Sequence, residues 1–239
     1  MNTLKINKGK TLMVAHRGVS GLEQENTMLA FVAAGNRSYF GIETDIHVTS
    51  DGEYVAIHDG HTGRVAKEKL VIADTDFATL RALKLCDREG DDTRVDVRIP
   101  TLAEYIRVCK KYEKICVLEL KNPMPDEDVR NIIACIEREE YLSSVIFISF
   151  SFDALVSVRK YAPDQPVQFL FNEFTDEIME KVKAHRFDVD VAYHALTEER
   201  VRELHEAGMK VNCWTVNSVE DGERLAAWGV DFITTNILE

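Results

Sequence analysis

Residues 41–60 read GIETDIHVTSDGEYVAIHDG, and this stretch decides how the rest of the chain is interpreted. Apolar residues alternate on both sides of a Ser-Asp-Gly turn at 50–52, which predicts a β-hairpin. The face that the hairpin would bury carries Glu43 and Asp45, and the return strand ends at His58, across from about Asp45. Because buried carboxylates are costly unless something compensates them, the hairpin predicts a polar site rather than a plain apolar core.

Outside the hairpin, short apolar segments rich in β-branched residues alternate with helical patterns along nearly the whole chain. We expect parallel strands over 11–16, 39–48, 114–121, 144–150, 166–171, 188–193, 210–216 and 230–235, and an antiparallel return strand over 53–58. We expect helices after an Asn26 N-cap and over 101–112, 126–140, 151–161, 174–185, 197–208 and 218–228. Eight βα units predict an α/β fold, a (β/α)8 TIM barrel that occupies 1–239 as a single domain. The alternative, an open doubly wound sheet, is disfavoured because VAHRGVSG offers no GxGxxG turn.

One segment interrupts this alternation. Residues 60–99 hold a short helical pattern over 76–85 and a charged loop over 87–98, which together are too long for an ordinary connection. Active sites of (β/α)8 barrels lie at the C-terminal ends of the strands. We therefore expect this segment to be a small insertion that caps the C-terminal mouth of the barrel.

Composition limits the classes of partner. The chain has 29 basic and 41 acidic residues and a formal charge of −12, which argues against nucleic acid and against anionic membranes. An anionic small molecule is not excluded, because a cleft can be locally positive. We expect no signal peptide and no stable membrane association, since no segment approaches the roughly 20 apolar residues of a membrane helix. The five cysteines are odd in number and form no CxxC, which predicts free thiols in a reducing cytoplasm.

Three carboxylates follow the strand pattern. Glu43 and Asp45 share one face of the second strand, and Glu119 lies near the end of the next parallel strand. These three hard oxygen ligands suit Mg²⁺ or Ca²⁺ and not Zn²⁺, which would favour His or Cys. A bound divalent cation would also compensate the buried charge of the hairpin.

Histidine and cationic side chains stand at the same strand ends. His16 and His58 have an ordinary pKa near neutrality, as general acid–base catalysis requires. Arg17 and Lys121 supply fixed positive charge for a phosphate or a carboxylate. The small-molecule partner is therefore expected to be anionic.

The pattern resembles the glycerophosphodiester phosphodiesterase family. The resemblance is carried by AHRG (15–18), ENT (25–27), E-x-D (43–45), HD (58–59), LELK (118–121), WTVN (214–217) and VDFITTN (230–236), in the family's order and at its spacing. The family also has an insertion after its HD motif, where 60–99 stands. Each motif is weak by itself, but together they are specific and span nearly the whole chain.

The resemblance implies a barrel that binds one divalent cation and hydrolyses glycerophosphodiesters to glycerol 3-phosphate and an alcohol. The implied roles are catalytic for His16 and His58, substrate-binding for Arg17, Lys121 and Trp214, and metal-binding for Glu43, Asp45 and Glu119. Two positions depart from the family pattern. Gln24 stands where the family usually has Pro, which changes loop rigidity, and Asn236 stands where it usually has Asp, which removes a charge near the rim.

Two other functions compete with this interpretation. A metal-dependent aldolase or lyase barrel would stabilise an enolate with one base, and it leaves Arg17 and the second histidine unexplained. A non-catalytic barrel that binds a phosphorylated ligand would be expected to lose a histidine or a metal ligand, and none is missing. The sequence leaves open the leaving alcohol, the choice between Mg²⁺ and Ca²⁺, which histidine is the acid, and the oligomeric state.

Overall fold

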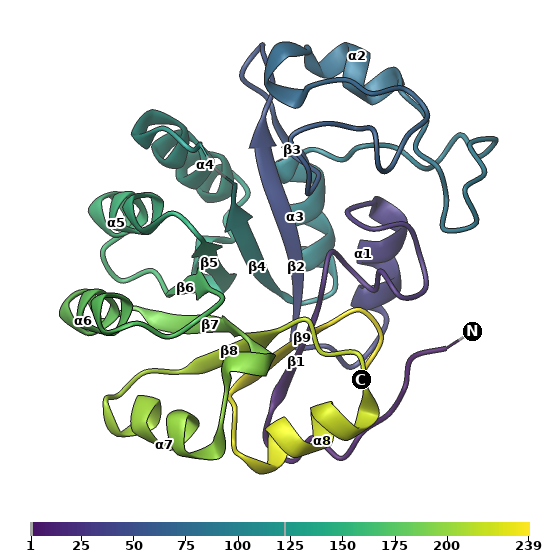
Figure 1. Cartoon of the computed structure of the whole chain (residues 1–239). Helices are drawn as coiled ribbons and strands as arrows, with labels where there is room; N and C mark the ends of the chain where they lie inside the picture. Colours follow the sequence, from purple (N-terminus) through teal and green to yellow (C-terminus); the bar gives the residue numbers. More distant parts are fainter. Residues whose placement is uncertain (1, 122) are drawn as a thin grey trace.

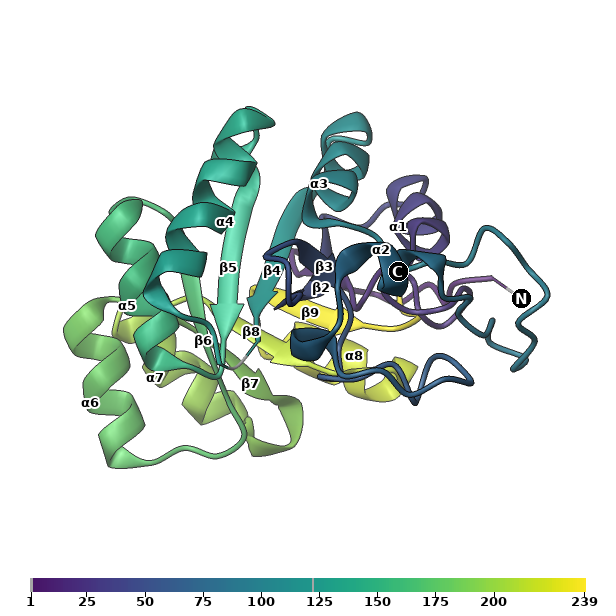
Figure 2. The ribbon, with the colours of Figure 1, turned by 90° about the horizontal axis from the view of Figure 1, so that it is seen from above.

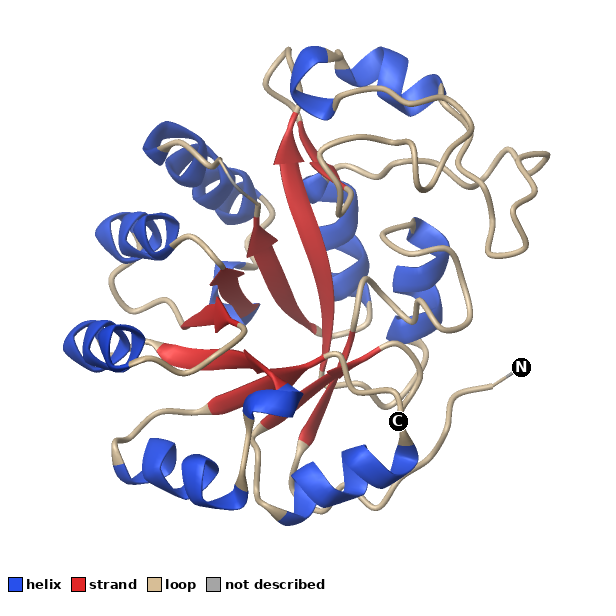
Figure 3. Ribbon diagram, viewed as in Figure 1, coloured by secondary structure: helices blue, strands red, loops and turns tan. Residues whose placement is uncertain are grey.

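Eight parallel strands close into a barrel surrounded by helices (Figures 1 and 3), as the strand count in the sequence predicts. The computed structural model describes residues 2–121 and 123–239. Around the barrel the strands follow the order β1-β9-β8-β7-β6-β5-β4-β2, and the pairing of β1 with β2 closes the ring. β3 is an additional strand that lies antiparallel to β2. The predicted (β/α)8 TIM barrel is therefore confirmed.

The elements alternate as expected, with somewhat tighter bounds. The strands are β1 (Leu12–Ala15), β2 (Gly41–Val48), β3 (Tyr54–Ala56), β4 (Ile115–Leu120), β5 (Val145–Ser149), β6 (Val167–Phe171), β7 (Asp188–Ala192), β8 (Val211–Trp214) and β9 (Phe232–Thr235). The helices are α1 (Met28–Gly35), α2 (Phe77–Ala82), α3 (Leu102–Lys111), α4 (Asp126–Arg138), α5 (Phe152–Tyr161), α6 (Asp176–His185), α7 (Glu198–Glu206) and α8 (Val219–Ala227), with short 3₁₀ turns at Ile72–Asp74, Leu142–Ser144 and Tyr193–Ala195. Within the described residues, no helix has the length and apolar character needed to cross a bilayer.

Each strand buries both of its faces, which explains the nearly continuous apolar runs in the sequence. The outward faces pack under the helices in one large apolar cluster. The inward faces form a separate small cluster, made by Val14, Val117, Ile148, Leu170 and Phe232. Since side chains alternate along a strand, the inward residues two positions further on, toward the C-terminal ends, share that face. This register delivers polar side chains to the mouth of the barrel above an apolar floor.

The start of α1 differs from the expectation. Thr27, not Asn26, is the N-cap, because its hydroxyl accepts a hydrogen bond from the Ala30 amide. Asn26 instead has a left-handed backbone (φ +52°), and its side chain is buried against β2. A residue that looks like a helix cap in the sequence therefore belongs to the polar site.

The hairpin forms with a register one residue away from the predicted one. Ile46 pairs with Ala56 in the β2–β3 ladder, and the Ile57 amide donates to the Asp45 carbonyl. Asp45 therefore lies across from Ile57, and His58 follows directly in the loop after β3. The shift arises because the connection between Val48 and Tyr54 holds five residues, more than a tight Asp-Gly turn requires.

The insertion at 60–99 builds a small apolar core of its own. Ile72, Leu80, Leu85, Val97 and Ile99 are buried there, together with residues of the hairpin. Figures 1 and 2 both place this segment on the side of the barrel where α1 and α3 lie. The segment is thus anchored to the hairpin, and its role as a cap over the mouth stays a prediction.

Candidate active site

Three carboxylates converge at the C-terminal ends of β2 and β4. Glu43, Asp45 and Glu119 are 2%, 1% and 8% exposed, and one oxygen from each lies within 4.8 Å of the others. The cause is local: the two-residue period turns Glu43 and Asp45 inward, and the parallel register sets Glu119 beside Asp45. The structure thus brings together all three residues predicted as metal ligands.

These carboxylates cannot all ionise easily in the protein alone. Burial raises the pKa of Glu43 well above its ordinary range, and burial together with the charge of Asp45 raises the pKa of Glu119 to about 8. Burial also opposes ionisation of Asp45, but the charges of Arg17 and Lys121 outweigh it and lower the pKa of that carboxyl. The cluster would ionise fully only with additional positive charge beside it.

The loop after β1 explains why Arg and Gly adjoin His16. Arg17 and Gly18 both have left-handed backbones, with φ of +54° and +73°. A Cβ at Gly18 would lie 2.6 Å from Ala30 of α1, so only glycine fits this turn. In this turn the backbone amide of Arg17 donates to Glu43 Oε2 at 2.7 Å, and the side-chain Nε of Arg17 lies 3.4 Å from Asp45 Oδ2. Arg17 therefore contacts the carboxylate cluster with both its backbone and its side chain.

His16 lies at the end of β1 with one ring nitrogen held in place. Its Nδ1 lies 2.7 Å from Asn236 Oδ1, and its Nε2 lies 4.0 Å from Glu43 Oε2. An amide oxygen can only accept, so Nδ1 carries the hydrogen and Nε2 is the nitrogen available to a ligand. Burial, followed by the charge of Arg17, lowers the pKa of His16 to about 4. Asn236 thus still supplies the acceptor, although it lacks the charge of an aspartate.

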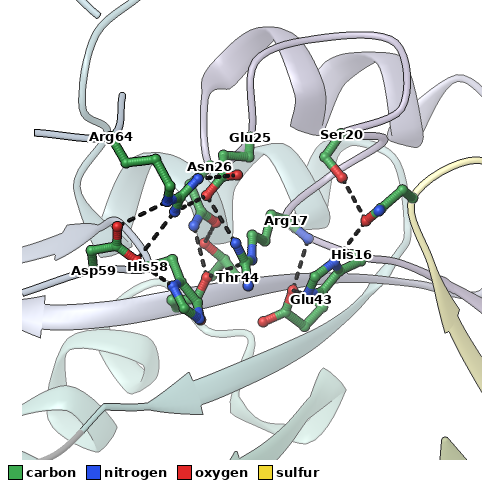
Figure 4. Close-up of polar contacts among 12 residues, drawn as sticks. His16, Arg17, Ser20, Glu25, Asn26, Glu43, Thr44, His58, Asp59 and Arg64 are labelled. Carbon is green, nitrogen blue, oxygen red and sulfur yellow. Dashed lines mark hydrogen bonds and ion pairs between the residues drawn. The ribbon is translucent and has the colours of Figure 1, made fainter. Parts of the chain in front are cut away.

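His58 is held by a chain of ion pairs that runs through the insertion (Figure 4). Its Nδ1 lies 2.7 Å from Asp59 Oδ1, and Asp59 Oδ2 accepts from Arg64 Nε at 2.8 Å. The same guanidinium donates to both oxygens of Glu25, at 2.7 and 2.8 Å, and Glu25 Oε1 lies 3.0 Å from Arg17 Nη1. The sequence pattern missed Arg64, since no periodicity links a loop residue to a partner 39 positions away.

Two further polar contacts complete the charged side of the site. The Lys121 ammonium lies 2.9 Å from Glu119 Oε1 and 3.4 Å from Asp45 Oδ1. Asn26 donates to Asp45 Oδ2 at 2.8 Å and accepts from the Thr44 hydroxyl at 2.7 Å. Both contacts hold Asp45 in the position from which it faces the cluster.

A cavity of about 90 Å³ opens beside these groups, well above the ~10–15 Å³ that a single water needs. Its charged side is lined by His16, Arg17, Glu43, His58 and Glu119. Its other side is largely apolar and is lined by Ile148, Phe150, Leu170, Asp190, Trp214, Thr215 and Thr234. The predicted wall residue Trp214 therefore lines the cavity, and its ring packs edge-on against Phe150 at 5.7 Å between centroids.

The chain is thus a (β/α)8 barrel with a charged pocket at the C-terminal ends of its strands, which is where enzymes with this fold have their active sites. Residues 16–239 match the family model described as the glycerophosphoryl diester phosphodiesterase family, and the chain therefore belongs to that family.

Individual relatives agree with this assignment. The chain is 29% identical to the glycerophosphodiester phosphodiesterase of Bacillus subtilis, over 95% of this chain and 84% of that protein. It is similar to a solved glycerophosphodiester phosphodiesterase from Parabacteroides distasonis (26% identity, TM-score 0.79, 95% and 93% of the two chains). It also shares its fold with an Oleispira antarctica phosphodiesterase solved with its product sn-glycerol-3-phosphate (24% identity, TM-score 0.83, 97% and 95%).

Proposed function

We propose that this chain hydrolyses glycerophosphodiesters to glycerol 3-phosphate and an alcohol. The observation that carries the proposal is the convergence of two histidines, Arg17, Glu43 and Glu119 on one cavity. The name of the Bacillus subtilis relative supports the substrate class. The site also contains each of the groups that such a reaction requires: positive charge for a phosphate, and two groups able to move protons.

We infer that Glu43, Asp45 and Glu119 hold one divalent cation, Mg²⁺ or Ca²⁺. Three buried carboxylates with oxygens within 4.8 Å fit an oxygen-ligated cation. Burial and the charge of Asp45 raise the pKa of Glu43 and of Glu119, and a cation beside them would favour their ionised forms. When bound, such an ion polarises a phosphoryl oxygen and stabilises negative charge that develops in the transition state.

Local charge supports an anionic substrate despite the acidic chain. With all groups ionised, Arg17 and Lys121 leave the three carboxylates with one net negative charge, and a divalent cation would turn this into one net positive charge. A phosphodiester carries a single negative charge, so the loaded site would match it. Arg17 and Lys121 would then contact the phosphoryl oxygens.

The two histidines would transfer protons on either side of the phosphorus. One histidine would remove a proton from the hydroxyl that forms a bond to phosphorus, either water or the neighbouring hydroxyl of the glycerol group, and the other would donate a proton to the oxygen of the leaving alcohol as its bond to phosphorus breaks. If the glycerol hydroxyl attacks, water then opens the resulting cyclic phosphate to give glycerol 3-phosphate. Asn236 and Asp59 hold the Nδ1 atoms of His16 and His58, respectively, which keeps each ring in one orientation.

Release of choline from glycerophosphocholine tests this function directly. The proposal predicts choline and glycerol 3-phosphate in equal amounts, and no choline once a chelator removes divalent cations. An aldolase or lyase would release none under any condition. A barrel that only binds phosphorylated ligands would bind glycerol 3-phosphate without turnover, and either result would overturn the proposal.

We further propose that the chain works in the cytoplasm. The five cysteines are free thiols, three of them buried, which suits a reducing compartment. A test is the distribution of the tagged protein after cell fractionation, which should follow cytoplasmic marker enzymes.

A further inference from the structure

Asp190 is the one acidic residue on the largely apolar wall of the cavity. It lies on β7, its side chain is 1% exposed, and it lines the same cavity as His16 and His58. Within residues 2–121 and 123–239, its Oδ1 is buried without a hydrogen-bond partner. A buried polar atom in this state costs stability, so its presence needs an explanation.

The neighbouring strands do not supply the missing partner. Asp190 pairs in register with Leu170 of β6 and Asn212 of β8. The Asn212 side chain instead donates to Gln168 at 2.9 Å and accepts from Thr234 at 3.2 Å. The Trp214 ring nitrogen reaches only the backbone carbonyl of Asp190, at 3.3 Å. These neighbours are therefore paired elsewhere, and the Oδ1 of Asp190, a residue that lines the cavity, has no hydrogen-bond partner among the described residues.

The position of Asp190 around the barrel indicates what it meets. β7 lies four strands from β2 in both directions around the ring, so Asp190 stands opposite Glu43 and Asp45. The cations Arg17 and Lys121 also lie on the β2 side. A ligand whose phosphate rests on those cations would extend its uncharged end toward β7.

The chemistry of the carboxyl suits an uncharged polar group. Burial, together with the charge of Glu119, raises the pKa of Asp190 well above its ordinary range, which favours the protonated form of the carboxyl. A protonated carboxyl offers one O–H donor and a carbonyl acceptor. An alcohol hydroxyl also donates and accepts once, and is thus the simplest complement.

We propose that Asp190 binds a hydroxyl of the substrate's glycerol group and determines specificity for it. This inference rests on the proposed function, because it takes the phosphate position from that function. Ile148, Leu170 and Trp214 line the same cavity as Asp190 with apolar surface. A ligand with methylene in place of the hydroxyl would leave the carboxyl unpaired, which a site built to bind a hydroxyl penalises.

Binding of two matched ligands to the full chain, in the presence of Mg²⁺, tests the inference. Glycerol 3-phosphate and n-propyl phosphate share the phosphate and the three-carbon chain, and only the first has hydroxyls. By calorimetric titration, Asp190→Leu should weaken the binding of glycerol 3-phosphate about tenfold, whereas n-propyl phosphate should bind as tightly as before or more tightly. Asp190→Asn keeps the volume and the hydrogen-bonding capacity of the side chain, so it should retain most of the preference for glycerol 3-phosphate over n-propyl phosphate.

Controls separate this role from a structural one. Asp188 lies two residues earlier on the same face and accepts from the Lys210 amide at 2.8 Å, so Asp188→Asn should change neither affinity. If Asp190→Leu does not fold, Asp190→Ala enters the same comparison. If the substitution of Asp190 weakens the binding of both ligands equally, or weakens the binding of neither, the inference is overturned. If either result is found but the wild type hydrolyses glycerophosphocholine, the inference about Asp190 fails and the proposed function stands. If the wild type neither hydrolyses glycerophosphocholine nor binds glycerol 3-phosphate, the proposed function itself is overturned.

Discussion

The two sides of the barrel mouth carry different kinds of side chain. On the side of β1, β2 and β4, charged groups of opposite sign lie together, as Arg17 and Lys121 do with Asp45. On the side of β5 to β8, the wall is largely apolar, and Asp190 is its acidic residue, with an Oδ1 that has no hydrogen-bond partner in the described chain. One barrel thus offers charge to one end of a ligand, and shape and hydrogen bonding to the other. This contrast suggests that chemistry and substrate choice can be altered separately.

The charged side should show the largest effect of a single substitution. Glu43→Gln removes one carboxylate of the cluster and should lower kcat by more than about 10³-fold, because a bound cation supplies several kcal/mol of transition-state stabilisation. Cation affinity, measured by titration calorimetry, should fall as well. Glu127→Gln changes an exposed carboxylate on α4 and serves as the control. Wild-type cation affinity in Glu43→Gln would contradict the assignment of this residue.

The histidines should show the next largest effect. His16→Ala and His58→Ala should each lose at least about 10²-fold in kcat, the usual contribution of a general acid or base. Circular dichroism should show the fold intact. His205→Ala, on the exposed surface of α7, is the matched control and should keep its activity. If His58→Ala keeps the wild-type rate, His58 is not a general acid or base, and the hairpin contributes no proton-transfer group to the reaction.

The ion-pair chain predicts a smaller effect that reaches the site from outside. Arg64→Ala should lower kcat about tenfold with little change in KM, because it frees Asp59 and Glu25, which hold His58 and Arg17. Arg64→Lys should recover part of the rate, since an ammonium can pair with one carboxylate but not bridge both as the guanidinium does. Arg94→Ala, which breaks a pair with Asp96 inside the insertion, should have no effect. If the Arg64 and Arg94 variants behave alike, the chain has no role in positioning His58.

The apolar wall should give the smallest effect. Trp214→Leu removes an aromatic contact worth roughly 0.5–1.5 kcal/mol and should change kcat/KM by about fivefold. Because Trp214 lines the wall on which the proposed glycerol site lies, the change should be the same for choline and ethanolamine leaving groups, and the cation requirement should stay the same. A weaker cation affinity in Trp214→Leu would show that the two sides of the mouth are not separable.

Much of the charged side could be predicted from the sequence because it follows from strand geometry. Because side chains alternate along a strand, Glu43 and Asp45 lie on the same face, and the parallel pairing of neighbouring strands brings Glu119 beside them. The family resemblance then supplied the roles of these residues. The fold could be predicted for the same reason, since strands buried on both faces leave a recognisable apolar run.

The remaining contacts arise from loops and from register, which the sequence pattern does not encode. Asn26 looked like a helix cap, and only its left-handed backbone sends the side chain to Asp45. Arg64 meets Glu25 across two loops. Asp190 could not be singled out, because DVDVAY reads as an ordinary strand until the barrel shows which face is inward.

The central claim is that the charged side of the mouth hydrolyses a glycerophosphodiester with the help of one divalent cation. Phosphorus NMR of glycerophosphocholine tests it most directly, with protein stripped by a chelator and then supplied with Mg²⁺ or Ca²⁺. The account predicts no change with stripped protein, and conversion of the diester signal to that of glycerol 3-phosphate once the cation is added. Full conversion in excess chelator, or no conversion with either cation, would contradict it.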